Sequence, residues 1–137
     1  MHFGSPMKPL DPEMIAWAAQ LACVFEVSAN KPGNVTSKTG FSDMTALDFM
    51  ASAVAIGPAM REAPMSGVGR TVQRAVDDTR RFVTANTNLG IVLLLAPLAK
   101  AAGTAHPGRL RSAVGDVLGN LTADDRRQAF AAIRKAS

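Results

Sequence analysis

An uncharged apolar stretch from Leu89 to Ala99 constrains the fold of this chain more than any other feature. A segment without a polar face needs cover on every side, which places it at the centre of a globular fold. Periodicity alone allows a buried strand or a buried helix, but the length of the stretch and its Ala-rich continuation favour a helix. The stretch is shorter than the ~18 residues that cross a bilayer. We therefore predict a central buried helix.

The rest of the composition favours helices as well. Hydrophobic residues make up 47% of the 137 residues, charged residues 19% and aromatic residues only 5%. Alanine, the strongest helix former, is abundant, whereas the aromatic residues that favour strands are scarce. We predict an all-α fold, a compact bundle of about six helices around the buried one. We expect residues 1–137 to form a single domain, with residues 1–10 flexible.

Capping signals locate three helix starts. They lie at Asp11-Pro12-Glu13, Thr45-Ala46-Leu47-Asp48 and Thr122-Ala123-Asp124-Asp125. With the apolar periodicity, they predict helices over residues 11–28, 46–56, 68–83, 89–99, 110–121 and 122–137. In the first helix the stripe predicted to face the core contains Met14, Trp17, Ala18, Leu21, Ala22, Val24 and Phe25. In the third helix it contains Val68, Val72, Ala75, Val76, Thr79, Phe82 and Val83.

Several classes of protein can be set aside. Cys23 is the single cysteine, so an intrachain disulfide framework is excluded, and its apolar surroundings indicate a buried thiol. The net charge of +4 arises from basic residues interleaved with acidic ones, a pattern typical of solvated helix faces. We expect neither nucleic acid nor a membrane as a partner, and we expect a cytoplasmic location.

Two polar clusters do not fit the amphipathic pattern. Glu26 lies on or beside the apolar stripe of the first helix, so its carboxylate should be partly desolvated. It could act in catalysis, or it could simply pair with Lys31 or with a loop amide. Farther along, Asp43 has no evident structural role, which makes it a candidate contact for a metal ion or a hydroxyl group. Asp48 more plausibly caps the second helix.

A third cluster, Asn86-Thr87-Asn88, directly precedes the apolar helix. Two amides and a hydroxyl beside the positive end of a buried helix could bind a phosphate or a sugar. Gly90 would let the ligand approach the backbone closely. Simple capping of the helix accounts for only one of the three side chains.

These clusters, in this order, resemble the triphosphoribosyl-dephospho-coenzyme A synthase family. The resemblance runs from about Leu21 to Ala102 and covers the N-terminal half of that longer, all-α family. It is carried by Glu26-Val27, Lys31-Pro32-Gly33-Asn34-Val35, Phe41-Ser42-Asp43-Met44, Asp48-Phe49, Ser52-Ala53, Asn86-Thr87-Asn88-Leu89-Gly90 and Leu93-Leu94-Leu95-Ala96-Pro97-Leu98-Ala99.

The resemblance implies transfer of the 5-triphosphoribosyl group of ATP to 3-dephospho-coenzyme A, or a related acceptor, with release of adenine. Such a transfer needs a carboxylate near the sugar, a base for the attacking hydroxyl and positive charge on the triphosphate. Glu26 and Asp43 are the candidate catalytic residues, and Asp43 could also hold Mg²⁺. The candidate nucleotide- or phosphate-binding residues are Lys31, Gly33, Asn86, Thr87, Asn88 and Gly90.

Two other functions remain open. The chain could be a helical module that binds a nucleotide or a coenzyme A derivative without turning it over. It could also be a helical subunit that forms homo-oligomers or associates through an exposed apolar face. We expect such a face on the helices around Val92 and Leu118, because apolar patches beyond a few hundred Å² are rare on monomers.

Overall fold

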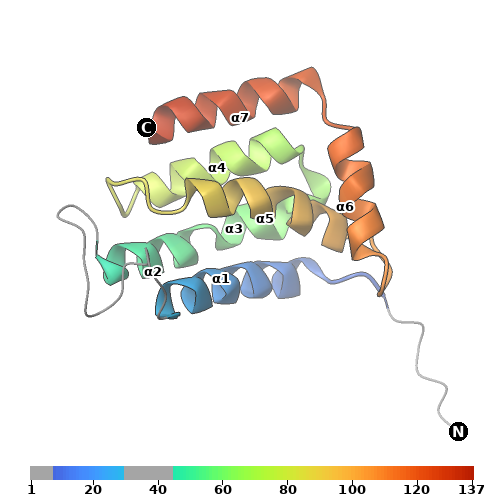
Figure 1. Cartoon of the computed structure of the whole chain (residues 1–137), viewed down its shortest axis with the longest axis horizontal. Helices are drawn as coiled ribbons and strands as arrows, with labels where there is room; N and C mark the ends of the chain where they lie inside the picture. The colour runs from blue at the N-terminus through green and yellow to red at the C-terminus, as the bar shows by residue number, and fades with distance from the viewer. Residues whose placement is uncertain (1–7, 30–44) are drawn as a thin grey trace, which may run out of the picture.

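The computed structural model describes residues 8–29 and 45–137, and this part of the chain is all-α (Figure 1). Seven α-helices and one 3₁₀ helix follow one another, with no strand among the described residues. They are α1 (Pro12–Ser28), α2 (Ala46–Ala55), α3 (Gly57–Glu62), η1 (Ala63–Met65), α4 (Val68–Arg80), α5 (Leu89–Ala102), α6 (Leu110–Gly119) and α7 (Ala123–Ala136). The predicted all-α class is confirmed. The helix that the sequence did not predict is α3, which starts at Gly57-Pro58.

The caps form as their sequences predict. Asp11 accepts a hydrogen bond from the Met14 amide at 2.9 Å and begins α1, with Pro12 in the first turn. Thr45 and Thr122 each close a complete capping box with the aspartate three residues later. Because these side chains take up amides that the helix leaves unpaired, the helix starts fall where the sequence placed them.

The helices lie in a stack with α1 at one edge and α7 at the other (Figure 1). Helix α4 packs most extensively against α7, and α5 contacts α1, α3, η1, α4, α6 and α7. Helix α5 is therefore the central helix, and it runs through Pro97 without interruption. Its outer side is nevertheless open, since Leu94 is 69% exposed and Leu98 is 38% exposed.

Small side chains dominate the core. Eleven of its members are Ala16, Ala19, Ala53, Ala55, Ala59, Ala63, Ala75, Ala96, Ala99, Ala101 and Ala132, and the largest fully buried side chains are Ile56, Met60, Val72 and Val92. Helices with alanine at their contacts can approach closely. The closest approach involves Gly69, where a Cβ atom would come within 2.6 Å of Asp125 Cα, so a larger residue would push α7 away from α4.

The predicted inner face of α1 is wrong. Its buried residues are Ile15, Ala16, Ala19, Cys23 and Val27, whereas Met14, Trp17, Ala18, Leu21, Ala22 and Phe25 are exposed. Helix α1 is apolar on two sides, and the side with its four largest exposed residues, Met14, Trp17, Leu21 and Phe25, faces away from α3 and α5. Phe82, predicted to be buried after α4, is also exposed. None of the described helices combines the length and hydrophobicity that crossing a bilayer requires.

Candidate nucleotide site

Two of the described segments that carry sequence-predicted site residues meet helix α2 at one end of the stack. The C-terminal end of α1, helix α2 and the loop of residues 84–88 that leads into α5 lie there (Figure 1). Helix α2 contacts both α1 and α4. Glu26 and Asn86 therefore belong to the same end of the molecule, although many residues separate them in sequence.

The Asn86-Thr87-Asn88 segment divides into one capping residue and two anchoring residues. Asn86 is exposed, and its Oδ1 accepts a hydrogen bond from the Leu89 amide at 3.3 Å. Thr87 and Asn88 are buried, with 6% and 8% of their surface exposed. The expectation that capping accounts for only one of the three residues is confirmed, and that residue is Asn86.

The two anchoring residues belong to a buried polar network with α2 and α4. The Thr87 hydroxyl is hydrogen-bonded to the hydroxyl of Ser52 on α2. The side-chain amide of Asn88 donates to Thr79 Oγ1 on α4 at 3.2 Å and to the Ser52 carbonyl at 3.4 Å. These bonds hold the loop that leads into α5 against two helices that precede it in the sequence.

The first turn of α5 has backbone amides without an acceptor in the helix. Val92 makes the first bond of the helix, from its amide to the Asn88 carbonyl at 2.9 Å, so the amides of Gly90 and Ile91 have no helical acceptor. Gly90 is exposed, and among the described residues no atom beyond its chain neighbours and its own helix lies within 4 Å of the place where its Cβ would stand. A phosphate could approach these amides at the positive end of the helix dipole.

A small hollow adjoins this loop, lined on one side by residues 84–88 and on the other by the last turns of α4 and α7. Arg80 lines it and donates to the carbonyl of Lys135 near the end of α7. Sequence reasoning assigned no site role to Ser52, Thr79 or Arg80. The available signal was a hydroxyl on the buried side of a helix, as at Ser52 and Thr79, since such groups need a polar partner in the core.

Glu26 lies in the last turn of α1 and is exposed, so the predicted desolvation of its carboxylate is wrong. Its charge affects the neighbouring Cys23 thiol. Burial, and secondarily the Glu26 carboxylate, raises the pKa of the Cys23 thiol from 9.0 to about 11. Cys23 is 3% exposed, which confirms the prediction of a buried, unreactive thiol. Lys31, Gly33 and Asp43 lie outside the described residues.

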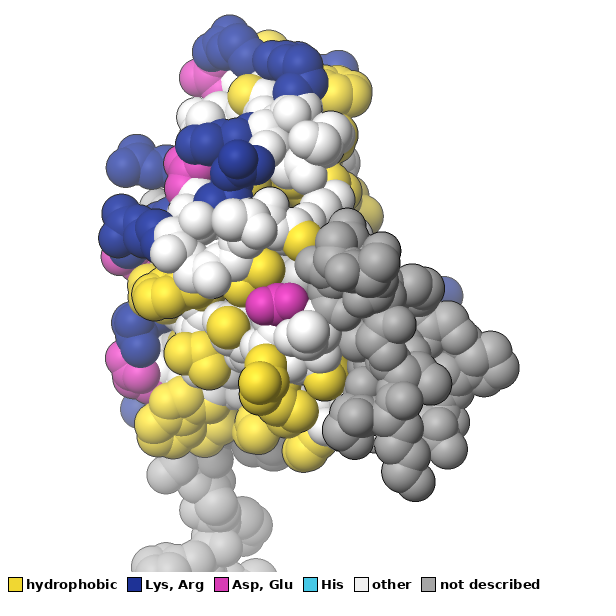
Figure 2. All heavy atoms as spheres, turned by 90° about the vertical axis from the view of Figure 1, so that its left-hand side faces the viewer, with side chains coloured by type: hydrophobic (Ala, Val, Ile, Leu, Met, Phe, Trp, Pro, Cys, Tyr) yellow, Lys and Arg dark blue, Asp and Glu magenta, His cyan; other side chains and the backbone are white. Residues whose placement is uncertain are grey.

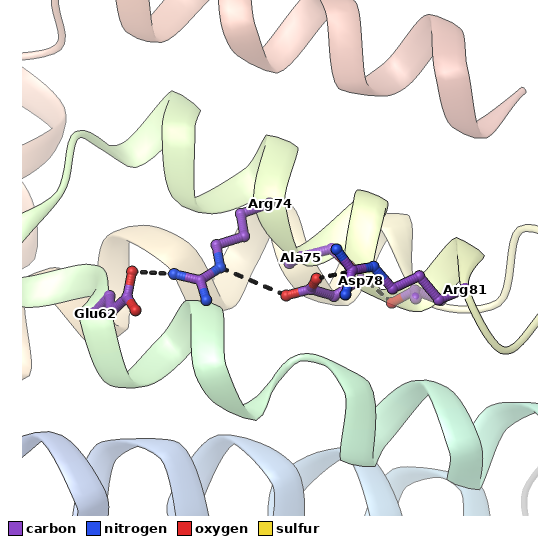
Figure 3. Close-up of polar contacts among 6 residues, drawn as sticks. Glu62, Arg74, Ala75, Asp78 and Arg81 are labelled. Atoms are coloured by element: carbon purple, nitrogen blue, oxygen red, sulfur yellow. Dashed lines mark hydrogen bonds and ion pairs between the residues drawn. The ribbon is translucent and has the colours of Figure 1, made fainter.

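Arg74 of α4 is committed to ion pairs. Arg74 pairs with Glu62 on α3 and with Asp78 at 3.5 Å, and Asp78 also faces Arg81 at 3.7 Å (Figure 3). Such surface pairs contribute little to stability, but they neutralise the charges of this face. This cluster is therefore part of the solvated surface and not of the candidate site.

No group of three or more His, Cys, Asp or Glu side chains is close enough to hold a metal ion in the part of the chain that the structure describes. Of the described carboxylates at this end, Asp48 accepts hydrogen bonds from the amide and the hydroxyl of Thr45. The described residues therefore do not form a magnesium site of their own.

These features define a helical protein with an anchored polar loop and an open helix start, a combination suited to a phosphorylated nucleotide. A family model described as CitG: ATP:dephospho-CoA triphosphoribosyl transferase matches residues 12–137. The chain therefore belongs to this family of ATP-dependent transferases, whose substrates are ATP and dephospho-CoA. No curated protein and no solved structure matches the chain significantly.

Proposed function

We propose that this chain carries out the family's transfer at the end of the stack formed by α1, α2 and the start of α5. In that reaction the bond between adenine and the ribose carbon of ATP breaks, and a hydroxyl of dephospho-CoA bonds to that carbon. The hydroxyl proton leaves with adenine. The observation that supports this location is the loop of residues 86–88, which is anchored by a buried network and leads into the first turn of α5, where Gly90 is exposed.

Each part of the reaction has a candidate residue. The amides of Gly90 and Ile91, with Lys31 and Gly33, would bind the triphosphate. The side-chain donors of Thr87 and Asn88 are already used within the protein, so these two residues would shape the loop and would not donate to the triphosphate. Glu26 would stabilise the cation-like ribose or deprotonate the acceptor hydroxyl, with Asp43 as the alternative.

We propose that Mg²⁺ enters together with ATP as part of the substrate. Mg²⁺ is usually held by substrate phosphates and by one or two carboxylates, and it keeps several of its water ligands. Asp43 is the candidate carboxylate. Calorimetric titration of the protein with Mg²⁺ alone and with Mg²⁺ plus ATP tests this proposal, because only the second mixture should give binding.

The direct test of function is incubation of the full chain with ATP, Mg²⁺ and dephospho-CoA, followed by mass spectrometry. We expect free adenine and a triphosphoribosylated product in equal amounts. Binding of ATP without release of adenine with any acceptor would instead identify a nucleotide-binding module. Absence of both binding and turnover would contradict the proposal.

We also propose that the chain associates with a second copy of itself through the outer face of α1. This face carries Met14, Trp17, Leu21 and Phe25, each between 43% and 65% exposed, and no charged residue. A groove of about 210 Å³, lined only by apolar residues that include Ala18, Leu98 and Leu110, continues it onto α5 and α6. Figure 2 shows hydrophobic side chains gathered over the lower part of the molecule, where α1 and α2 lie, with Lys and Arg above.

The size and chemistry of this face favour a second copy as its occupant. Since an aromatic side chain offers about 150–250 Å² when fully exposed, the exposed parts of these residues amount to several hundred Å². That is on the order of the ~800 Å² that each partner contributes to a stable interface. An uncharged apolar face is complementary to itself in a twofold arrangement and causes no like-charge repulsion.

The face is not quite where the sequence placed it. Val92 is fully buried, whereas its neighbours Leu94 and Leu98 on α5 and Leu118 on α6 are exposed. Sedimentation velocity over a wide range of concentrations tests the association, and we expect a concentration-dependent dimer. A strict monomer, or a complex that forms only with a different protein, would contradict it.

A further inference from the structure

The side-chain amide of Asn88 has a fixed orientation in the buried network. Its nitrogen points at the Ser52 carbonyl, which can only accept, at 3.4 Å. It also points at Thr79 Oγ1 at 3.2 Å, and the Thr79 hydroxyl donates its own hydrogen to the Ala75 carbonyl at 2.8 Å. Both neighbours are therefore acceptors, so the nitrogen of the amide must face them and the oxygen Oδ1 must face away.

No donor of the network remains for this oxygen. The Ser52 hydroxyl donates to the Asp48 carbonyl at 2.7 Å, so it accepts the hydrogen of the Thr87 hydroxyl. Asn88 Oδ1 does not cap α5 either, because Asn88 occupies the N-cap position but makes no side-chain hydrogen bond to the amides of the first turn. Among the described residues, Asn88 Oδ1 thus has no hydrogen-bond partner, although the residue is only 8% exposed.

This oxygen keeps some accessible surface, and its residue lines the hollow of about 10 Å³ beside the loop, which has room for one water-sized group such as a hydroxyl. Asn88 lines that hollow together with Thr84, Asn86 and Arg80. Within the described part of the chain, no fully enclosed side-chain oxygen or nitrogen lacks a partner, so Oδ1 is not sealed in the core. A buried side chain whose acceptor is held unpaired at the edge of a hollow is suited to receive a donor from a ligand.

We propose that Asn88 Oδ1 accepts a hydrogen bond from the nucleoside part of ATP, and that Ser52 and Thr79 are the positioning residues that aim it. This inference rests on the proposed function and deepens it. Phosphate oxygens are acceptors and would be repelled by Oδ1, whereas a ribose hydroxyl or the amino group of adenine can donate. The amides of Gly90 and Ile91 nearby would take the phosphates, which leaves the nucleoside for Asn88.

Equilibrium binding of ATP analogues to the full chain tests this assignment. Two of the analogues, 2′-deoxy-ATP and 3′-deoxy-ATP, each lack one sugar hydroxyl. The third, purine riboside triphosphate, lacks the amino group of the base. We expect the wild type to bind one of them about tenfold more weakly than ATP, the effect of one lost hydrogen bond. The analogue that loses affinity identifies the donor.

Variants separate recognition from structure. Asn88→Ala should bind ATP and the weakened analogue with equal affinity, because the acceptor is gone. Thr79→Val keeps the shape of the side chain but releases the amide, so discrimination between ATP and that analogue should fall. Thr79→Ser retains the hydroxyl, so this variant should discriminate between ATP and the analogue as the wild type does. A purely structural role of Thr79 would change the melting temperature of both variants without changing this selectivity.

The outcomes distinguish this inference from the proposed function. The wild type could release adenine and yet show the same ratio of affinities for ATP and for each analogue as Asn88→Ala. In that case the assignment of Asn88 fails and the proposed function stands. If the wild type binds neither ATP nor dephospho-CoA, the function fails and the assignment fails with it. Should Thr79→Val not fold, the comparison of wild type with Asn88→Ala still decides the question.

Discussion

Glu26 lies in the last turn of α1, at the negative end of the helix dipole. It also raises the pKa of the neighbouring Cys23 thiol, after the larger effect of burial. The residue is exposed, which is compatible with the catalytic role proposed for it.

Replacement of Glu26 by glutamine tests that role. Glu26→Gln removes the charge and keeps nearly the same shape, so the variant should fold and bind ATP like the wild type. Adenine release should slow by at least ~10²-fold, as loss of a general base predicts. Both quantities can be measured by calorimetric titration with ATP and by chromatographic assay of adenine.

Glu13→Gln is the matched control. Glu13 lies in the first turn of the same helix and pairs with Arg61 on α3, so its loss should cost a fraction of a kcal/mol of stability and leave turnover unchanged. Unchanged turnover in a folded Glu26→Gln protein would move the catalytic role to Asp43.

At the scale of helices, one aspartate joins two elements. Asp125 closes the capping box of α7 with Thr122, and its Oδ1 also accepts the Gly69 amide of α4 at 3.0 Å. Partial burial acts to raise the pKa of Asp125, but the hydrogen bonds from Thr122 and Gly69, with the charge of Lys100, lower it below its ordinary value of 3.8. The ionised carboxylate thus stabilises the docking of α7 on α4.

Asp125→Asn should therefore destabilise the protein by about 1–3 kcal/mol at neutral pH, since a charged acceptor of several hydrogen bonds is lost. Because folding lowers the pKa of Asp125, the stabilisation is complete above its ordinary value of 3.8 and declines as pH falls through the lower folded value. Denaturant unfolding at a series of pH values measures the free energy of unfolding of the wild type and of Asp125→Asn. The difference between the two values should shrink as the pH falls below 3.8.

The exposed Asp124 on the same helix provides the comparison, with a side chain that is 67% exposed. Asp124→Asn should change stability by less than about 1 kcal/mol. An Asp125→Asn protein as stable as Asp124→Asn at neutral pH would show that the contact with Gly69 is weak.

Helix α5 begins with a glycine that no neighbouring side chain or backbone requires. Gly90→Ala should raise stability by up to about 1 kcal/mol, because alanine favours helix and nothing lies in the way of its Cβ. If a phosphate approaches the backbone here, the same change should weaken ATP binding. Thermal unfolding and the Kd for ATP measure the two effects.

Gly115→Ala in α6 is the corresponding control, since its Cβ would also meet open space. It should raise stability without changing the Kd for ATP. A Gly90→Ala protein with unchanged affinity would exclude close approach of the nucleotide to this backbone.

The sequence located elements better than faces. Caps at Asp11, Thr45 and Thr122 place helix starts to within a residue, because they depend on neighbours along the chain. The inner face of α1 could not be read from periodicity, because both sides of the helix are apolar. The partners of Asn88 could not be read from the sequence either, since Ser52 and Thr79 come from other helices.

Over the described part of the molecule, many of the largest apolar side chains lie on the surface, while alanine is the commonest residue of the core. Trp17, Phe25, Phe82 and Phe130 are all more than half exposed, and no described aromatic residue belongs to the core. Aromatic residues are enriched at protein interfaces. Because α1 and α7 form opposite edges of the stack, the aromatic residues of α1 and of α7 can be tested separately (Figure 1).

Phe25→Gln on α1 should abolish or weaken the proposed self-association without lowering the stability of the monomer, because Phe25 is 65% exposed. Loss of an aromatic side chain from the centre of an interface typically costs at least ~2 kcal/mol of binding, about a thirtyfold rise in Kd. Phe130→Gln on α7 removes an aromatic residue of similar exposure, 60%, from the opposite edge and should leave the dimer intact. Sedimentation equilibrium of the three proteins gives each Kd. Equal weakening by both substitutions would show that hydrophobic surface in general, and not the outer face of α1, drives association.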